Sequence, residues 1–120
     1  MPTPKILIVD GSETRAARID SIVREAGYVP VRAGSDALER ARTERPDLIL
    51  LNVEIPQDDG YEVCRELRGD QAIRHIPVIA MTEPRNSADQ LWARMQGASD
   101  VVSQPCSVEQ LLAAIRTALI

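Results

Sequence analysis

Short apolar runs alternate with amphipathic stretches along the chain. Residues 5–9, 48–51 and 78–81 are mostly apolar runs closed by polar or turn residues, which is typical of strands buried on both faces. Residues 28–32 and 101–102 are shorter strand candidates. Between these runs, apolar residues recur at helical spacing. Strand followed by helix, five times over, predicts an α/β fold: a doubly wound, three-layer sandwich with a five-stranded parallel sheet and five helices.

Capping and breaking residues set the expected helix ends. Ser12 is a good N-cap for the first helix, and Gly27 is a good stop for it. The second helix is expected to end before Arg45, because the residue that precedes a proline disfavours helical backbone. The five helices are expected to open at Ser12, Ser35-Asp36, Tyr61, Ser87 and Ser107. Ser87 and Ser107 each have the spacing of a capping box.

Composition narrows the class of protein. The 120 residues, of which 44% are hydrophobic and 27% charged, suit one domain spanning residues 1–120. The net charge of −4 argues against a general nucleic-acid surface, and no apolar run approaches the roughly 20 residues of a membrane span. Cys64, Cys106 and His75 lack the spacing of a metal site or a disulfide framework. We therefore expect a cytoplasmic protein with reduced thiols, a core Cys64, an inert Cys106, and neither a nucleic-acid nor a membrane partner.

Four polar side chains follow four of the predicted strands: Asp10, Asn52, Thr82 and Gln104. Because the crossover connections of parallel strands are right-handed, the carboxyl ends of the strands lie along one edge, where α/β proteins place their chemistry. Asn52 ends the central strand, where a nucleophile is expected, yet a carboxamide is a poor nucleophile. The Thr82 hydroxyl is expected to hydrogen-bond with nearby backbone groups.

A set of short motifs follows the predicted strands: ILIVD (6–10), DLILLNV (47–53), IP (55–56) with DGY (59–61), PVIAMT (77–82), and GASD (97–100) with QP (104–105). Together these motifs resemble a response-regulator receiver domain, and the resemblance spans nearly the whole chain. The run at residues 92–98 is most similar to single-domain receivers of type IV pilus twitching-motility systems.

The resemblance implies a flavodoxin-like receiver fold and a set of site positions. In that family an aspartate at the end of the third strand accepts a phosphoryl group from a histidine kinase, and neighbouring acids hold Mg²⁺. Transferred residue by residue, the phosphoacceptor falls on Asn52, the acid pair on Asp10 and Gly11, the phosphoryl contacts on Thr82 and Gln104, and the switch aromatic on Val101.

These positions depart from the family pattern in ways that compound. The Asn52 amide cannot form an acyl phosphate, so no catalytic residue is expected. Asp10 is the one residual metal candidate, and Mg²⁺ binding is expected to be weak or absent, with no other cofactor. The sequence thus predicts a degenerate pseudo-receiver that is not an enzyme. Its expected role is that of a phosphorylation-independent protein-interaction module in two-component signalling.

The resemblance also implies a partner face, which in this family lies on the fourth helix, fifth strand and fifth helix, here residues 87–118. Candidate contact residues on this face are Trp92, Met95, Val101 and Val108. The expected partner is a signalling protein, such as a histidine kinase or a motility component. Two alternatives stay open: an Mg²⁺-dependent phosphoacceptor with displaced chemistry, and an anion- or small-molecule-binding flavodoxin-like domain.

Restoring the lost side chains tests whether only side chains have changed. The triple change Gly11→Asp, Asn52→Asp and Gln104→Lys is expected to recover Mg²⁺ binding and some phosphorylation. Because the restored carboxylates repel one another without a cation, Mg²⁺ should raise the melting temperature of the triple variant more than that of the parent. A folded variant with no such Mg²⁺ dependence would mean that the loops around the site have moved as well.

Overall fold

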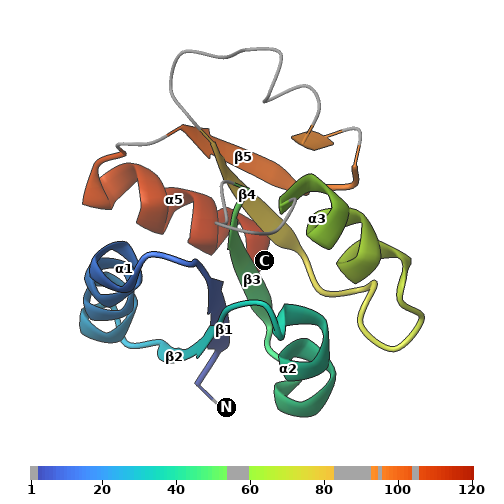
Figure 1. Ribbon diagram of the computed structural model, residues 1–120. Helices are drawn as coiled ribbons and strands as arrows, with labels where there is room; N and C mark the ends of the chain where they lie inside the picture. The colour runs from blue at the N-terminus through green and yellow to red at the C-terminus, as the bar shows by residue number, and fades with distance from the viewer. Residues whose placement is uncertain (1–2, 54–59, 83–92, 95, 104–105) are drawn as a thin grey trace.

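Five parallel strands form one sheet in the order β2-β1-β3-β4-β5, with all neighbouring strands paired in parallel (Figure 1). The computed structural model describes residues 3–53, 60–82, 93–94, 96–103 and 106–120. The strands are β1 (Lys5–Val9), β2 (Val29–Ala33), β3 (Leu48–Asn52), β4 (Val78–Thr82) and β5 (Asp100–Ser103). The helices are α1 (Glu13–Glu25), α2 (Ala37–Glu44), α3 (Gly60–Gly69) and α5 (Val108–Ala118). The predicted doubly wound α/β fold is confirmed.

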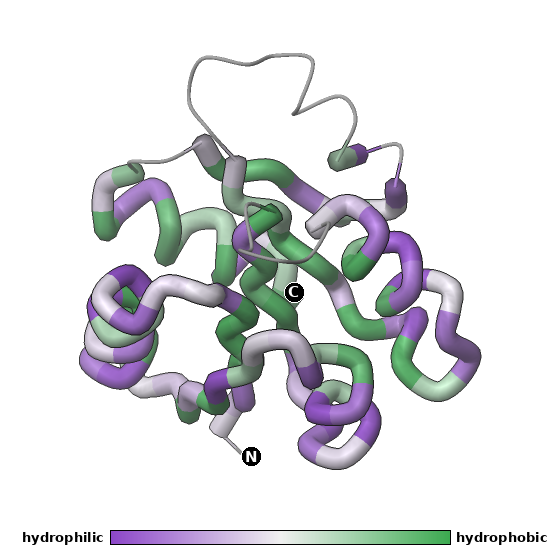
Figure 2. Tube along the Cα trace, in the orientation of Figure 1, coloured by the Kyte–Doolittle hydropathy of each residue, from purple (hydrophilic) through white to green (hydrophobic). Residues whose placement is uncertain are grey.

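Helices cover both faces of the sheet and leave its middle strands with no exposed face. Helices α1 and α5 pack on one face, and α2 and α3 pack on the other (Figure 1). Every residue of β3 and β4 is buried, so both strands are apolar almost throughout, as sheets covered on both sides require. Figure 2 shows that the central strands are hydrophobic, whereas hydrophobic and hydrophilic residues alternate along the helices.

The helix ends follow the predicted signals with one exception. Ser12 caps α1 by accepting a hydrogen bond from the Arg15 backbone N–H at 3.3 Å. Ser107 and Gln110 form the reciprocal capping box of α5, with both hydrogen bonds at 3.0 Å. Asp36 is the N-cap of α2 but makes no capping bond, because its carboxylate accepts a hydrogen bond from the Gly34 N–H at 3.0 Å.

Some predicted boundaries need correction. Strand β2 lies one residue later than predicted, and β5 is longer than the predicted residues 101–102. Helix α3 extends one residue beyond the predicted segment at each end. The helix predicted to open at Ser87 falls mostly outside the described residues, although Ala93 and Arg94 are helical. Four helices therefore flank the sheet in the described part of the chain, where the sequence predicted five.

Gly60 begins α3 at a point where the backbone passes very close to the end of β3. A Cβ atom at this position would collide with the carbonyl oxygen and the Cα atom of Val53, which are backbone atoms and cannot rotate away. Only glycine fits this close approach. Gly60 thus holds the first turn of α3 against the carboxyl edge of the sheet, next to Asn52.

We expect Gly60→Ala to lower the free energy of unfolding by roughly 1–3 kcal/mol, the usual range for overpacking against atoms that cannot move. Gly69→Ala is the matched control, because Gly69 ends the same helix and a Cβ there would meet no atom within 4 Å. Urea denaturation of both variants checks the prediction. Equal stability of the two variants would show that the approach of Gly60 to Val53 is not tight.

Candidate functional site

Three polar residues are buried in the described part of the chain, and all three stand at carboxyl ends of strands. Asp10 is 8% exposed, Asn52 is 1% exposed and Thr82 is 0% exposed. Val9 is in register with Leu51, so Asp10 and Asn52 leave β1 and β3 side by side. The topology therefore gathers three of the four predicted strand-end residues at one edge of an otherwise apolar core.

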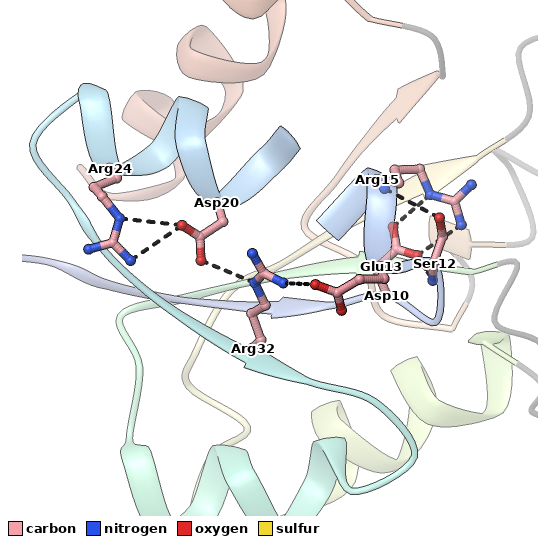
Figure 3. A network of polar contacts seen from close by, with 7 residues as sticks. All are labelled: Asp10, Ser12, Glu13, Arg15, Asp20, Arg24 and Arg32. Atoms are coloured by element: carbon pink, nitrogen blue, oxygen red, sulfur yellow. Dashed lines mark hydrogen bonds and ion pairs between the residues drawn. The ribbon is translucent and has the colours of Figure 1, made fainter. Parts of the chain in front are cut away.

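The Asp10 carboxylate accepts four hydrogen bonds from described residues, and Figure 3 shows those from Arg15 and Ser12. Arg15 donates two of them, from Nε to Oδ2 at 2.7 Å and from Nη2 to Oδ1 at 2.8 Å. The Ser12 backbone N–H donates to Oδ1 at 2.8 Å, and the Asn52 amide Nδ2 donates to Oδ2 at 3.2 Å. Both carboxylate oxygens are thus engaged by a cation, a helix N-terminus and a neutral amide.

Arg15 is the residue of this site that the sequence reasoning missed. It lies in the first turn of α1, and side chains on a helix lean toward its N-terminus, so the guanidinium reaches back to the end of β1. The planar guanidinium then meets the carboxylate in the two-bond geometry that arginine favours. An arginine in the helical turn after a strand-end aspartate was the available signal.

A second chain of ion pairs fixes α1 against β2 beside the Asp10 cluster (Figure 3). Arg32 on β2 donates to Glu13 at 2.6 Å and to Asp20 at 3.2 Å, and Asp20 also pairs with Arg24 at 3.3 Å. The hydrogen bond with Glu13, followed by that with Asp20, raises the pKa of the Arg32 guanidinium. Glu13 and Arg24 are largely exposed, so their ion pairs contribute little to stability, whereas Asp20 is mostly buried between Arg24 and Arg32.

A similar surface pair joins α2 to the turn after α3. Arg42 donates to the Asp70 carboxylate through Nε at 2.8 Å and also through Nη2. The hydrogen bond from Arg42, with further help from the Ala72 backbone N–H, lowers the pKa of Asp70. This pair lies outside the carboxyl-edge site.

The Thr82 hydroxyl has no hydrogen-bond partner in the described part of the chain, although the oxygen is buried. The expectation that this hydroxyl bonds with nearby backbone groups is therefore wrong for the described residues. Thr82 ends β4, next to Ser103 at the end of β5. Among the described residues, Thr82 is thus a buried hydroxyl whose polar group is not compensated by a hydrogen bond.

The other predicted site residues that the structure describes are Gly11, Val101 and Val108, which lie after β1, on β5 and at the start of α5. Gly11 is exposed directly after Asp10. Val101 is half-buried and packs against the core on the α2 and α3 side, whereas Val108 at the start of α5 is 43% exposed. The predicted positions Gln104, Trp92 and Met95 lie outside the described residues.

The two cysteines differ in environment. Cys64 is fully buried, and this burial raises the pKa of its thiol to about 11, against a smaller opposite effect of Arg68. The thiol of Cys64 therefore stays protonated and behaves as a small core side chain, as predicted. Cys106 is partly buried and packs against the core on the α1 and α5 side.

Two surface hollows lie near the predicted positions. One, of about 370 Å³, adjoins Asp10 and is lined by Gly11, Glu13, Arg32 and Arg40 among others. The other, of about 600 Å³, runs between β5 and α5. Within the described ranges no three His, Cys, Asp or Glu side chains are grouped in a way that would hold a metal ion. None of the helices described combines the length and hydrophobicity needed to cross a lipid bilayer.

The chain is similar in sequence to a large set of signalling proteins. The family model for the response regulator receiver domain matches residues 6–116. The chain is 34% identical over 119 residues to the polar-differentiation response regulator DivK of Brucella ovis, and the match covers 98% of this chain and 97% of DivK.

Solved structures agree with the sequence match. The signal receiver domain of a signal transduction histidine kinase from Syntrophus aciditrophicus is 34% identical with a TM-score of 0.89, covering 98% of this chain and 90% of that one. The receiver domain of the sensor histidine kinase PA1611 from Pseudomonas aeruginosa PAO1, which has a magnesium ion coordinated in its active-site cleft, is 25% identical with a TM-score of 0.89. That match covers 98% of both chains.

Replacing Thr82 tests the unpartnered hydroxyl. Thr82→Val keeps the shape and removes the hydroxyl, so we expect the free energy of unfolding to stay the same or rise by about 1 kcal/mol. Thr82→Ser is the matched control: it keeps the hydroxyl, loses the methyl group and should lower the free energy of unfolding by about 1 kcal/mol. Chemical denaturation of the two variants decides the matter, and a clear loss of stability in Thr82→Val would mean that the hydroxyl has a partner.

Proposed function

The chain belongs to the family of response regulator receiver domains, the signalling modules of two-component systems, and we propose that it acts as a phosphorylation-independent receiver that binds a protein partner. In this proposal the carboxyl edge of the sheet is a structural element, and the signal depends on docking rather than on a covalent phosphoryl group. The family's position for the phosphoacceptor is occupied by Asn52.

The state of Asn52 is the observation that carries the proposal. The nitrogen lone pair of a carboxamide is delocalised and its oxygen is uncharged, so the side chain has no group that attacks phosphorus. Asn52 is 1% exposed, and its amide nitrogen donates to Asp10 at 3.2 Å. The side chain therefore serves as a buried hydrogen-bond donor at the end of β3.

The residues at this edge do not fit a divalent cation. Mg²⁺ favours carboxylate oxygens in octahedral geometry, and Asp10 is the one carboxylate among the three buried polar residues of the described chain. Both of its oxygens accept hydrogen bonds, including two from a guanidinium. The receiver domain of PA1611 holds a magnesium ion, whereas the function that we propose for this chain does not involve one.

The proposed partner face comprises β5 and α5 with the preceding segment, residues 87–118. The hollow of about 600 Å³ between β5 and α5, lined by Val101, Ser103, Gln110 and Ala114 among others, offers a recessed surface on this face. Val108 is exposed at the start of α5 and could contact a partner directly. Receiver domains interact with signalling proteins such as histidine kinases, and we propose a partner of this class, with a motility component as the alternative.

The small-molecule alternative has one supporting observation, the hollow of about 370 Å³ beside Asp10. The Arg40 guanidinium at this hollow donates to the Arg32 carbonyl oxygen at 3.3 Å and forms no ion pair with a described residue. Asp10, Glu13 and Asp36 also line the hollow, and their charges oppose a multiply charged anion. We therefore rank this alternative below the protein-binding role. The displaced phosphoacceptor also ranks below the protein-binding role, because no observation in the structure supports displaced chemistry.

Treatment with acetyl phosphate and Mg²⁺ tests the proposed function. We expect intact-mass spectrometry to detect no phosphoryl adduct on the parent protein, because the Asn52 amide cannot accept one. A related receiver with an aspartate at that position, treated in parallel, is the positive control. A phosphoryl adduct on this chain that is lost at alkaline pH would contradict the proposal and support the displaced phosphoacceptor.

A further inference from the structure

The pairing of Asp10 with Arg15 has a role that the loss of the phosphoacceptor does not explain. The Asp10 side chain is 1% exposed, and that of Arg15 is 35% exposed. A carboxylate removed from water this completely needs a compensating charge, or the folded state becomes unstable. The replacement of the phosphoacceptor by Asn52 does not by itself explain why this positive charge is supplied by a protein side chain.

We infer that Arg15 is a built-in counter-cation, which neutralises the carboxyl edge and makes the fold independent of divalent metal. The inference deepens the proposed function and rests on it in one respect: Asp10 and Asn52 must stand at the family's acid and phosphoacceptor positions. Arg15 then supplies the positive charge that a metal ion supplies to a receiver with a complete acidic site.

The geometry of the pair opposes the entry of a metal ion. A divalent cation at Asp10 would need at least one carboxylate oxygen, but Arg15 donates to both at 2.7 and 2.8 Å. The cation would also be repelled by the guanidinium at short range. Arg15 would therefore have to leave before a metal ion could bind.

Arg15 is also tethered, which gives it an advantage over a free ion. Its backbone N–H donates to the Ser12 side chain at 3.3 Å, so the first turn of α1 already fixes the residue close to Asp10. A tethered charge loses little translational freedom when it pairs, whereas a metal ion from solution loses much more. The tether therefore favours Arg15 over a metal ion from solution as the partner of Asp10.

This inference revises the restoration expected from the sequence alone. The triple variant Gly11→Asp, Asn52→Asp, Gln104→Lys would still contain Arg15, and the guanidinium would stay paired with the enlarged cluster of acids. We now expect a strong Mg²⁺ response only when Arg15 is removed as well, in a quadruple variant that adds Arg15→Gln.

Single substitutions test the charge requirement first. We expect Arg15→Gln to lower the melting temperature by about 10 °C in metal-free buffer, because Asp10 loses its cation. Arg15→Lys keeps a positive charge and should recover about half of that loss. Arg18→Gln is the matched control, because Arg18 is exposed on the same helix and has no ion pair with a described residue; its melting temperature should equal that of the parent.

Millimolar Mg²⁺, compared with NaCl of equal ionic strength, tests the metal independence. The parent, Arg15→Lys and Arg18→Gln should melt at the same temperature in both salts, whereas Arg15→Gln should melt higher in Mg²⁺. The inference is wrong if the parent gains stability specifically from Mg²⁺, or if Arg15→Gln melts at the parental temperature in metal-free buffer.

Comparison of the triple and quadruple variants then isolates Arg15 in a site with restored acids. The rise in melting temperature caused by Mg²⁺ should be several-fold larger in the quadruple variant than in the triple variant. A quadruple variant that folds only when Mg²⁺ is present would also support the inference. An equal or larger rise in the triple variant would overturn the inference. If the quadruple variant folds in neither salt, the single variants decide. Acetyl phosphate treatment of the parent tests the proposed function separately, so the two ideas can fail independently.

Discussion

A carboxylate buried at the end of an apolar sheet must be compensated, and the compensation of Asp10 ties together the elements around it. Arg15 and the Ser12 backbone bind Asp10 to the start of α1, and Asn52 binds it to the end of β3. Because strands β1 and β3 are neighbours in the sheet, these contacts fix the edge at its centre. The Asp10 charge therefore links the start of α1, the loop after β1 and the end of β3 at one point.

The compensated edge changes what a receiver scaffold can do. In our proposal, the site holds its own cation and has no acceptor group, so its charge does not change with the concentration of metal ions. A fold of this kind provides a constant surface, formed by helices that pack on both sides of a buried sheet (Figure 1). Constant surfaces suit docking, in which affinity depends on shape and contact rather than on a change of chemical state.

Most of the fold could be predicted from the sequence because its signals are local. Apolar runs bounded by turn residues located all five strands to within a residue or two, and the capping box at Ser107 placed α5 correctly. The rule that parallel strands end at a common edge correctly predicted that Asp10, Asn52 and Thr82 lie at one edge of the sheet.

The chemistry within the site was harder to predict because it depends on side-chain direction. The sequence indicated one carboxylate among neutral groups, whereas Arg15 reaches back from α1 to make it part of an ion pair. Helical periodicity gives no sign of such a contact, since the partner lies before the helix. The sequence also could not show that the Thr82 hydroxyl has no hydrogen-bond partner among the described residues, because hydrogen bonding depends on three-dimensional neighbours.

The Asp10–Arg15 pair also affects how easily phosphoryl transfer could be restored to this scaffold. A lineage returning to phosphotransfer would need an aspartate at position 52 and the loss of Arg15. Gaining the aspartate first crowds two carboxylates around one guanidinium, and losing Arg15 first leaves Asp10 buried without a cation. Each order passes through an unfavourable intermediate, so under our proposal the Asp10–Arg15 pair hinders the restoration of phosphoryl transfer to this scaffold.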